Sequence, residues 1–139
     1  MKKTKLINSN ISYMISKMGH KDTLTIADSG LPIPNDVDRI DLALQKGIPS
    51  FMDCFKSVMS ELKVEEVIIA SEMEKISPEL YEELMKEIEN IKDEENCDIK
   101  ITRVNHEEFK EITKDTKAVI RSGEFTPFAN IILKSGVVF

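Results

Sequence analysis

The side chains best suited to proton transfer lie at the two ends of one short apolar segment. His20 precedes this segment and Asp28 follows it, and glycines next to each indicate loops. Imidazole and carboxylate are the groups that most often transfer protons near neutral pH. The pattern therefore indicates acid and base chemistry. Asp28 before Ser29 and Gly30 is also explained by an ordinary turn, although the C-terminal edge of a strand in an open α/β sheet is where ligands usually bind.

The second of the two histidines has a different local setting. His106 follows Asn105, which is placed to cap the start of a helix, whereas His20 lies just past a predicted helix end at Gly19. The helix dipole favours a cation at a C-terminal end and disfavours one at an N-terminal end. We therefore expect His20 to be more protonated and His106 to be neutral, as in an acid and base pair. Histidines at helix ends are also often only caps or surface residues.

The separation between His20 and Asp28 limits what one subunit can do. Eight residues in strand conformation span about 26 Å at ~3.3 Å each. The two side chains can therefore contact one small molecule only if the chain bends between them or if they come from different subunits.

Two further segments carry polar residues where ligands could bind. Lys110 lies four residues after His106, so the two share a helix face that is either ligand-binding or solvated. The loop 121–124 follows a strand, and it is either functional or a plain connection. No phosphate-binding loop, nucleophile elbow or zinc-ligand spacing is present, and Cys54 and Cys97 do not form a metal-ligand pattern. We therefore expect no metal site.

Composition and charge predict one soluble domain. The 139 residues are 41% hydrophobic and 32% charged, which suits a globular chain with its own core. The net charge of −6 argues against nucleic-acid or anionic-membrane partners, because phosphate binding needs concentrated cations. No signal peptide and no membrane-spanning apolar stretch is found in the sequence, so we expect a cytoplasmic protein with reduced cysteines.

Alternating helices and strands must position these residues. Apolar periodicity and capping patterns predict helices near 8–18, 35–47, 50–62, 77–91 and 105–112. Apolar runs and strict alternation predict strands at 23–27, 67–70, 98–104, 118–120 and 130–133, and the run 92–96 is expected to be a polar loop. This order predicts a single-domain α/β fold over residues 1–139, with helices flanking a mostly parallel central sheet.

The same residues carry a resemblance to the ribose and fucose mutarotase family. The resemblance covers Lys3 to Phe139, and its main blocks are Gly19-His20-x-Asp22, Asp28-x-Gly30-Leu31-Pro32-Ile33-Pro34, His106-Glu107-x-Phe109-Lys110 and Arg121-Ser122-Gly123-Glu124-x-Thr126-Pro127. Further blocks lie at 39–44, 47–51 and 129–133. The Gly-Leu-Pro-Ile-Pro and Arg-Ser-Gly-Glu blocks are similar to the ribose branch rather than to the fucose branch.

The resemblance implies an isomerase without a cofactor that interconverts β-D-ribopyranose and β-D-ribofuranose. It also implies a homodecamer of two stacked pentamers, with sites between neighbouring subunits that would bring His20 and Asp28 together. By position, His20 matches the proton donor of the family. The sugar-binding positions are matched by Asp28, His106, Lys110, Phe128, Ala129 and Asn130. Phe128 is a departure, because the family commonly has tyrosine there, and the missing hydroxyl removes one hydrogen bond.

The implied reaction suits these residues. Ring opening needs a proton delivered to the ring oxygen and another removed from the anomeric hydroxyl, and a positioned acid or base contributes about 10²–10⁴ in rate. His20 is the expected acid, while His106 and Asp28 are both candidates for the base. Three other readings stay open: a mutarotase for another sugar such as L-fucose, a non-catalytic ribose-binding accessory protein of sugar uptake, and a structural subunit without sugar affinity.

Overall fold

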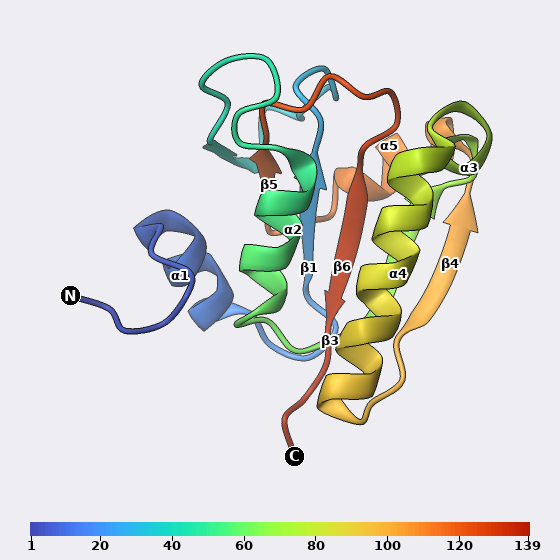
Figure 1. Cartoon of the computed structure of the whole chain (residues 1–139). Helices are drawn as coiled ribbons and strands as arrows, with labels where there is room; N and C mark the ends of the chain where they lie inside the picture. Colours follow the sequence, from blue (N-terminus) through green and yellow to red (C-terminus); the bar gives the residue numbers. More distant parts are fainter.

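A six-stranded sheet runs through the molecule in a computed structural model that describes all residues, 1–139 (Figure 1). The strand order is β2-β5-β1-β6-β3-β4. The strands are β1 Thr23–Ala27, β2 Asp38–Asp41, β3 Val64–Ala70, β4 Lys100–Val104, β5 Ala118–Arg121 and β6 Ile131–Ser135. Only β6 runs antiparallel to its neighbours, β1 and β3, while the other three pairings are parallel. The predicted mostly parallel α/β sheet is therefore confirmed.

Helices cover both faces of this sheet (Figure 1). One face carries α1 Ser9–Lys17, α2 Phe51–Met59 and α4 Pro78–Glu95, and the other carries α5 His106–Thr113. The short helix α3, Glu72–Ile76, directly follows β3. The larger core has 26 buried residues and joins α1, α2 and α4 to the sheet, and a smaller core of 7 lies under α5. No helix combines the length and the apolar character that crossing a bilayer requires.

Side-chain caps begin three helices where the sequence predicts them. The cap residues are Asn8 before α1, Ser50 before α2 and Asn105 before α5, and each side-chain oxygen accepts a backbone N–H three residues further on. Ser77 precedes α4, but its hydroxyl donates instead to the carbonyl of Pro127 at 2.7 Å. This bond ties the start of α4 to the connection between β5 and β6.

The predicted helix over 35–47 is wrong, because this segment contains the edge strand β2. Strand β2 pairs in parallel with β5 over its whole length. Val37 packs into the smaller core and Ile40 into the larger one, so these two side chains point to opposite faces. Leu44, the third member of the apparent helical stripe, is 79% exposed. The spacing of Val37, Ile40 and Leu44 is helical, but the three side chains lie in three different environments and form no common buried stripe.

The polar loop predicted over 92–96 is also wrong, because α4 continues through Glu95. Lys92 forms a pair with Glu89 at 3.1 Å on the helix surface, which is favourable at this spacing. The helix ends at Asn96, whose φ of 47° is left-handed. Solvated side chains here belong to a helix surface. Helix α3 was not among the predicted elements.

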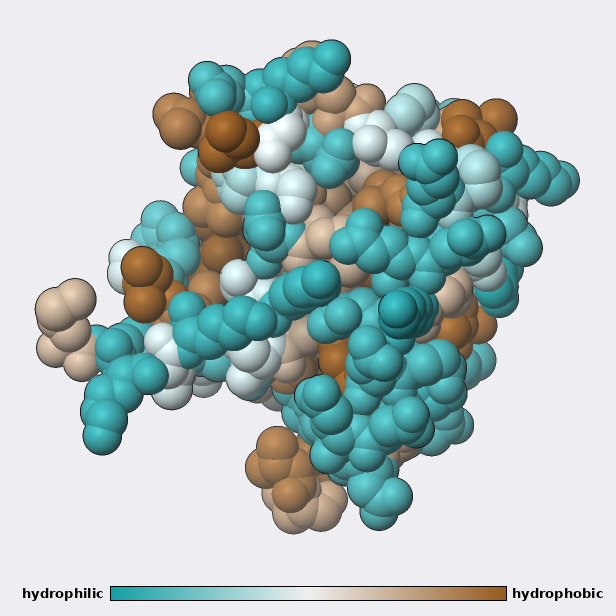
Figure 2. All heavy atoms as spheres, viewed as in Figure 1, coloured by the Kyte–Doolittle hydropathy of each residue, from teal (hydrophilic) through white to brown (hydrophobic).

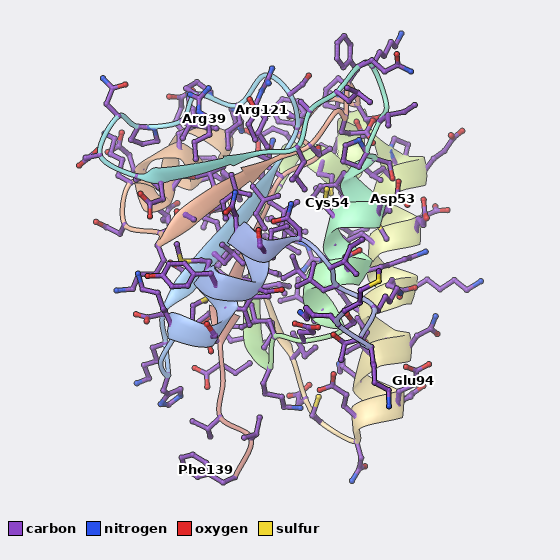
Figure 3. All side chains as sticks on the ribbon, turned by 90° about the vertical axis from the view of Figure 1, so that its left-hand side faces the viewer. Arg39, Asp53, Cys54, Glu94, Arg121 and Phe139 are labelled. Atoms are coloured by element: carbon purple, nitrogen blue, oxygen red, sulfur yellow. The ribbon has the colours of Figure 1, made fainter.

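Exposed apolar side chains lie at both ends of the strands: at the N-terminal edge of the sheet, where the parallel strands begin, and at the C-terminal edge, where they end. Figure 2 shows hydrophobic side chains projecting at the bottom, where Figure 1 places the C-terminal segment. Val138 and Phe139 there are 86% and 101% exposed. Figure 3 shows Phe139 at the end of the molecule opposite Arg121, the last residue of β5. Large apolar residues are also exposed in the loops and the short helix that follow the C-terminal ends of the parallel strands, namely Leu44, Ile48, Ile76 and Phe125.

Candidate functional site

A pocket opens at the C-terminal edge of the sheet. It has a volume of about 350 Å³, which is within the range of small-molecule sites. Three segments line it: the loop after β1, the start of α5, and residues 122–130 between β5 and β6, called here the β5–β6 strap. The lining residues are Asp28–Pro32, His106 and Glu124–Phe128.

Asp28 is held in place by a reciprocal pair with Asn130. The backbone N–H of Asp28 donates to Asn130 Oδ1 at 2.9 Å, and Asn130 Nδ2 donates to Asp28 Oδ2 at 2.8 Å. Asp28 Oδ1 accepts the N–H of Gly30 at 2.9 Å, so the turn expected from the sequence is present. Asn130 and Ala129 are fully buried and do not line the pocket. Asn130 therefore acts on the pocket by orienting the carboxylate.

His106 begins α5 with its ring beside the pocket. Its backbone N–H donates to Glu72 Oε1 at 3.0 Å, and this bond is the main reason that the pKa of Glu72 lies below its ordinary value. The ring meets Phe128 edge-on, with 5.0 Å between ring centroids. Its Nδ1 atom is buried without a hydrogen-bond partner.

Glu124 anchors the β5–β6 strap. Its carboxylate accepts the N–H of Phe51 at the start of α2 at 3.2 Å, and the N–H and hydroxyl of Thr126 at 3.0 and 2.7 Å. Burial acts to raise the pKa of Glu124, but these hydrogen bonds together outweigh it and hold the pKa below its ordinary value. Phe128 has a left-handed φ of 62°, a conformation that bulky residues rarely adopt. The anchored strap holds it there, against His106.

His20 lies at the opposite edge of the sheet. It precedes β1, whereas the pocket follows β1, and the five residues of that strand alone span about 13 Å. Its Nε2 atom is 2.8 Å from Glu65 Oε2 at the start of β3, and its side chain is 46% exposed. One chain therefore does not bring His20 and Asp28 together, as the separation estimated from the sequence indicates.

Lys110 is also outside the pocket lining. It lies one helical turn after His106, as predicted, and its ammonium is 2.7 Å from Glu107 Oε1 on the same helix. Of the predicted site residues, the structure thus brings together Asp28, His106 and Phe128, with Asn130 and Ala129 beneath them. No group of three His, Cys, Asp or Glu side chains is arranged to hold a metal ion.

Sequence reasoning missed three residues that support the pocket: Glu72, Ser77 and Glu124. The signal for Glu124 was its loop at a strand end, which the sequence could not distinguish from a plain connection. The helix predicted near 77–91 begins at Ser77, but the bond of this residue to the strap has no sequence signal. Glu72 had none either, because α3 was not predicted.

Known proteins resemble this chain over its whole length. The RbsD / FucU transport protein family matches residues 1–138. The chain is 58% identical to a D-ribose pyranase from Clostridium perfringens and 51% identical to one from Vibrio parahaemolyticus, over 100% of both chains in each case. Bacillus subtilis RbsD, solved in complex with D-ribose, matches with a TM-score of 0.87 and 45% identity over 100% of both chains. FucU from Bifidobacterium longum matches with a TM-score of 0.76 and 26% identity, covering 98% of this chain and 99% of that one. The chain therefore belongs to the RbsD / FucU transport protein family.

Proposed function

We propose that this chain is an isomerase that interconverts the pyranose and furanose forms of D-ribose. The observation that carries the proposal is the identity of 51–58% to D-ribose pyranases over the full length. The pocket agrees with this activity, because its volume of about 350 Å³ suits a single pentose and its lining combines polar side chains such as Asp28 and His106 with apolar ones such as Phe128.

Sugar binding is assigned to the pocket side chains. The Asp28 carboxylate is positioned to accept hydrogen bonds from sugar hydroxyls, and His106 Nε2 offers a further bond. The Phe128 ring forms an apolar wall for the C–H face of the ring. Lys110 reaches the sugar only if its side chain leaves Glu107, which a surface ion pair permits at little cost.

The reaction requires two proton transfers. His20 gives a proton to the ring oxygen while a base removes the proton of the anomeric hydroxyl. The bond between C1 and the ring oxygen then breaks, and an open-chain aldehyde forms. Attack on C1 by the hydroxyl at C4 closes the furanose, and the two protons return. His106 and Asp28 are both candidates for the base, and no cofactor takes part.

His20 must act in the pocket of a neighbouring subunit, because it lies at the other edge of its own sheet. Contact between opposite edges of identical chains is heterologous, and such contacts form a ring when the rotation from one subunit to the next closes. Exposed apolar residues at both edges, among them Phe125 and Phe139, support this assembly. We place the protein in the cytoplasm as two stacked pentamers, and ten chains of 15.8 kDa predict a mass of about 158 kDa in solution.

NMR magnetisation transfer between the ribopyranose and ribofuranose signals tests the proposal. Wild-type protein at catalytic concentration should accelerate exchange of D-ribose more than that of L-fucose run in parallel. His20→Ala should lower the acceleration by about 10²–10⁴, the contribution of one positioned acid. Saturable ribose binding without faster exchange would instead identify a binding protein, and no ribose affinity at all would identify a structural subunit.

A further inference from the structure

The partner of His20 is a glutamate that the reaction described above does not use. Glu65 Oε2 lies 2.8 Å from His20 Nε2; Glu65 is near the start of β3, and His20 is in the turn that precedes β1. We infer that Glu65 is the positioning residue of the catalytic histidine, and that it fixes which ring nitrogen transfers the proton. This inference rests on the proposed role of His20.

The backbone holds His20 in a defined position. The turn 19–22 is closed by the N–H of Gly19, which donates to Asp22 Oδ2 at 2.9 Å, and by the N–H of Asp22, which donates to the carbonyl of Gly19 at 3.2 Å. Lys21, the residue after His20, has a left-handed φ of 70°. Its N–H donates to the carbonyl of Ser135 at 2.9 Å. The imidazole therefore extends from a turn that is fastened to the end of β6.

A β-bulge presents Glu65 to this histidine. Val64 pairs with Ser135 and Glu66 pairs with Lys134, so Glu65 is the extra residue of β3 opposite one step of β6. A bulge of this kind redirects the side chain of the extra residue. The backbone of Gly136 passes close by, because a β-carbon added there would lie 3.3 Å from Glu65 Cβ. A regular strand would not place this carboxylate in the same direction.

The pair determines the chemistry of the two ring nitrogens. An ionised carboxylate only accepts hydrogen bonds, so His20 Nε2 must carry a hydrogen when it bonds to Glu65. The proton that His20 gains and loses in catalysis is then the one on Nδ1. Nδ1–H protonates the sugar ring oxygen, and the neutral ring that remains keeps Nε2–H on Glu65. Catalytic histidines are commonly oriented by a carboxylate in this way.

Substitution of Glu65 tests the inference through rates and through the histidine itself. Glu65→Ala should lower kcat for ribose exchange about tenfold, part of the ~10²–10⁴ that a positioned acid supplies, with KM within about twofold. Glu65→Gln should retain kcat within about threefold, because its amide oxygen can still accept Nε2–H. Glu111→Ala is the matched control, since Glu111 forms an exposed pair with Lys114 at 2.7 Å and contacts neither His20 nor the pocket lining. It should behave as wild type.

Nitrogen-15 spectra of the imidazole rings give a readout that does not depend on activity. The chain has only two histidines, so His106 serves as the internal reference. At alkaline pH, His20 should be a single Nε2–H tautomer in wild type and a mixture of tautomers in Glu65→Ala. Unchanged His20 shifts in Glu65→Ala, or a wild-type kcat in that variant, would overturn the inference. Full activity in His20→Ala would instead show that His20 is not the acid. The nitrogen-15 spectra would still show whether Glu65 fixes the tautomer of His20.

Discussion

Phe128 forms a wall of the pocket through its ring, and its backbone is fixed by its neighbours. The N–H of Asn130 donates to the Phe128 carbonyl at 2.8 Å, and the ring meets His106 edge-on. The ring and the left-handed backbone are features that a phenylalanine and a tyrosine share. Phe128 therefore offers the pocket the same ring and backbone conformation that a tyrosine would offer there.

Substitution of Phe128 should separate the role of the ring from that of a phenol. Phe128→Tyr should change ribose exchange by no more than about tenfold, because one added hydroxyl at a solvent-accessible pocket contributes only ~0.5–1.5 kcal/mol. Phe128→Ala should weaken ribose binding at least about tenfold, because the aromatic wall is lost. Calorimetry and exchange NMR measure the two effects. Equal affinity in Phe128→Ala and wild type would show that the ring does not contact the sugar.

Asn130 supplies hydrogen-bond partners to the backbone N–H and the carboxylate of Asp28 from the buried side of the pocket. Asn130→Ala leaves the N–H of Asp28 and one carboxylate oxygen without this partner in a partly buried position, which should lower the free energy of unfolding by about 1–2 kcal/mol. Ribose affinity should fall as well, since the carboxylate is no longer oriented. Urea denaturation and calorimetry measure these losses. Asn90→Ala, at an exposed position of α4, is the control and should change neither quantity.

At the scale of elements, the sheet is tied together by a carboxylate on β3. Glu66 accepts hydrogen bonds from Lys134 of β6 at 2.7 Å and Thr102 of β4 at 2.6 Å, and Lys100 of β4 lies 3.1 Å away. These bonds, with that of Lys134 the strongest, lower the pKa of Glu66 from 4.5 to about 2. One ionised side chain therefore links three neighbouring strands.

The sign of this shift predicts how stability depends on pH. Because the pKa is lower in the folded state, the stabilisation is complete above about pH 4.5 and is lost as the pH falls toward 2. Glu66→Gln should lower the free energy of unfolding by about 1–2 kcal/mol at pH 7, and the difference from wild type should shrink between pH 4.5 and 2. Urea denaturation at several pH values measures it. A difference that does not vary with pH would contradict the assignment, and Glu111→Gln should show none.

The sequence predicts helices and strands well where a local signal, such as a capping residue or a single hydrophobic periodicity, determines them. The caps at Asn8, Ser50 and Asn105 are local, so three helix starts are found from the sequence. Strand β2 is missed because Ile40 in the strand and Val37 just before it face different cores that only the folded sheet creates. Local spacing cannot report partners that lie some 80 residues further along the chain, as β5 does from β2.

The pocket shows the same limit. Asp28 and His106 are recognisable from residue type and position, but the bonds of Glu72, Ser77 and Glu124 join segments that are distant in sequence. No single-sequence pattern contains those contacts.

At the scale of the whole molecule, the fold separates the two halves of the proposed site. The pocket with Asp28 is at the C-terminal edge of the sheet, and His20 with Glu65 is at the N-terminal edge. In the proposed reaction each half needs the other, so activity should depend on assembly. The estimate of about 26 Å for eight extended residues already indicated this from the sequence. Which surfaces meet could not be predicted, because their apolar residues are scattered along the chain.

The most direct test of the central claim is ribose exchange by mixed subunits. His20→Ala and Asp28→Asn should each be nearly inactive alone. After joint dissociation and reassembly at equal amounts, one site in four combines an intact His20 with an intact Asp28 from a neighbouring chain, so exchange should return to about a quarter of the wild-type rate under the same treatment. A mixture no more active than the two variants measured separately would contradict a site that is shared between subunits.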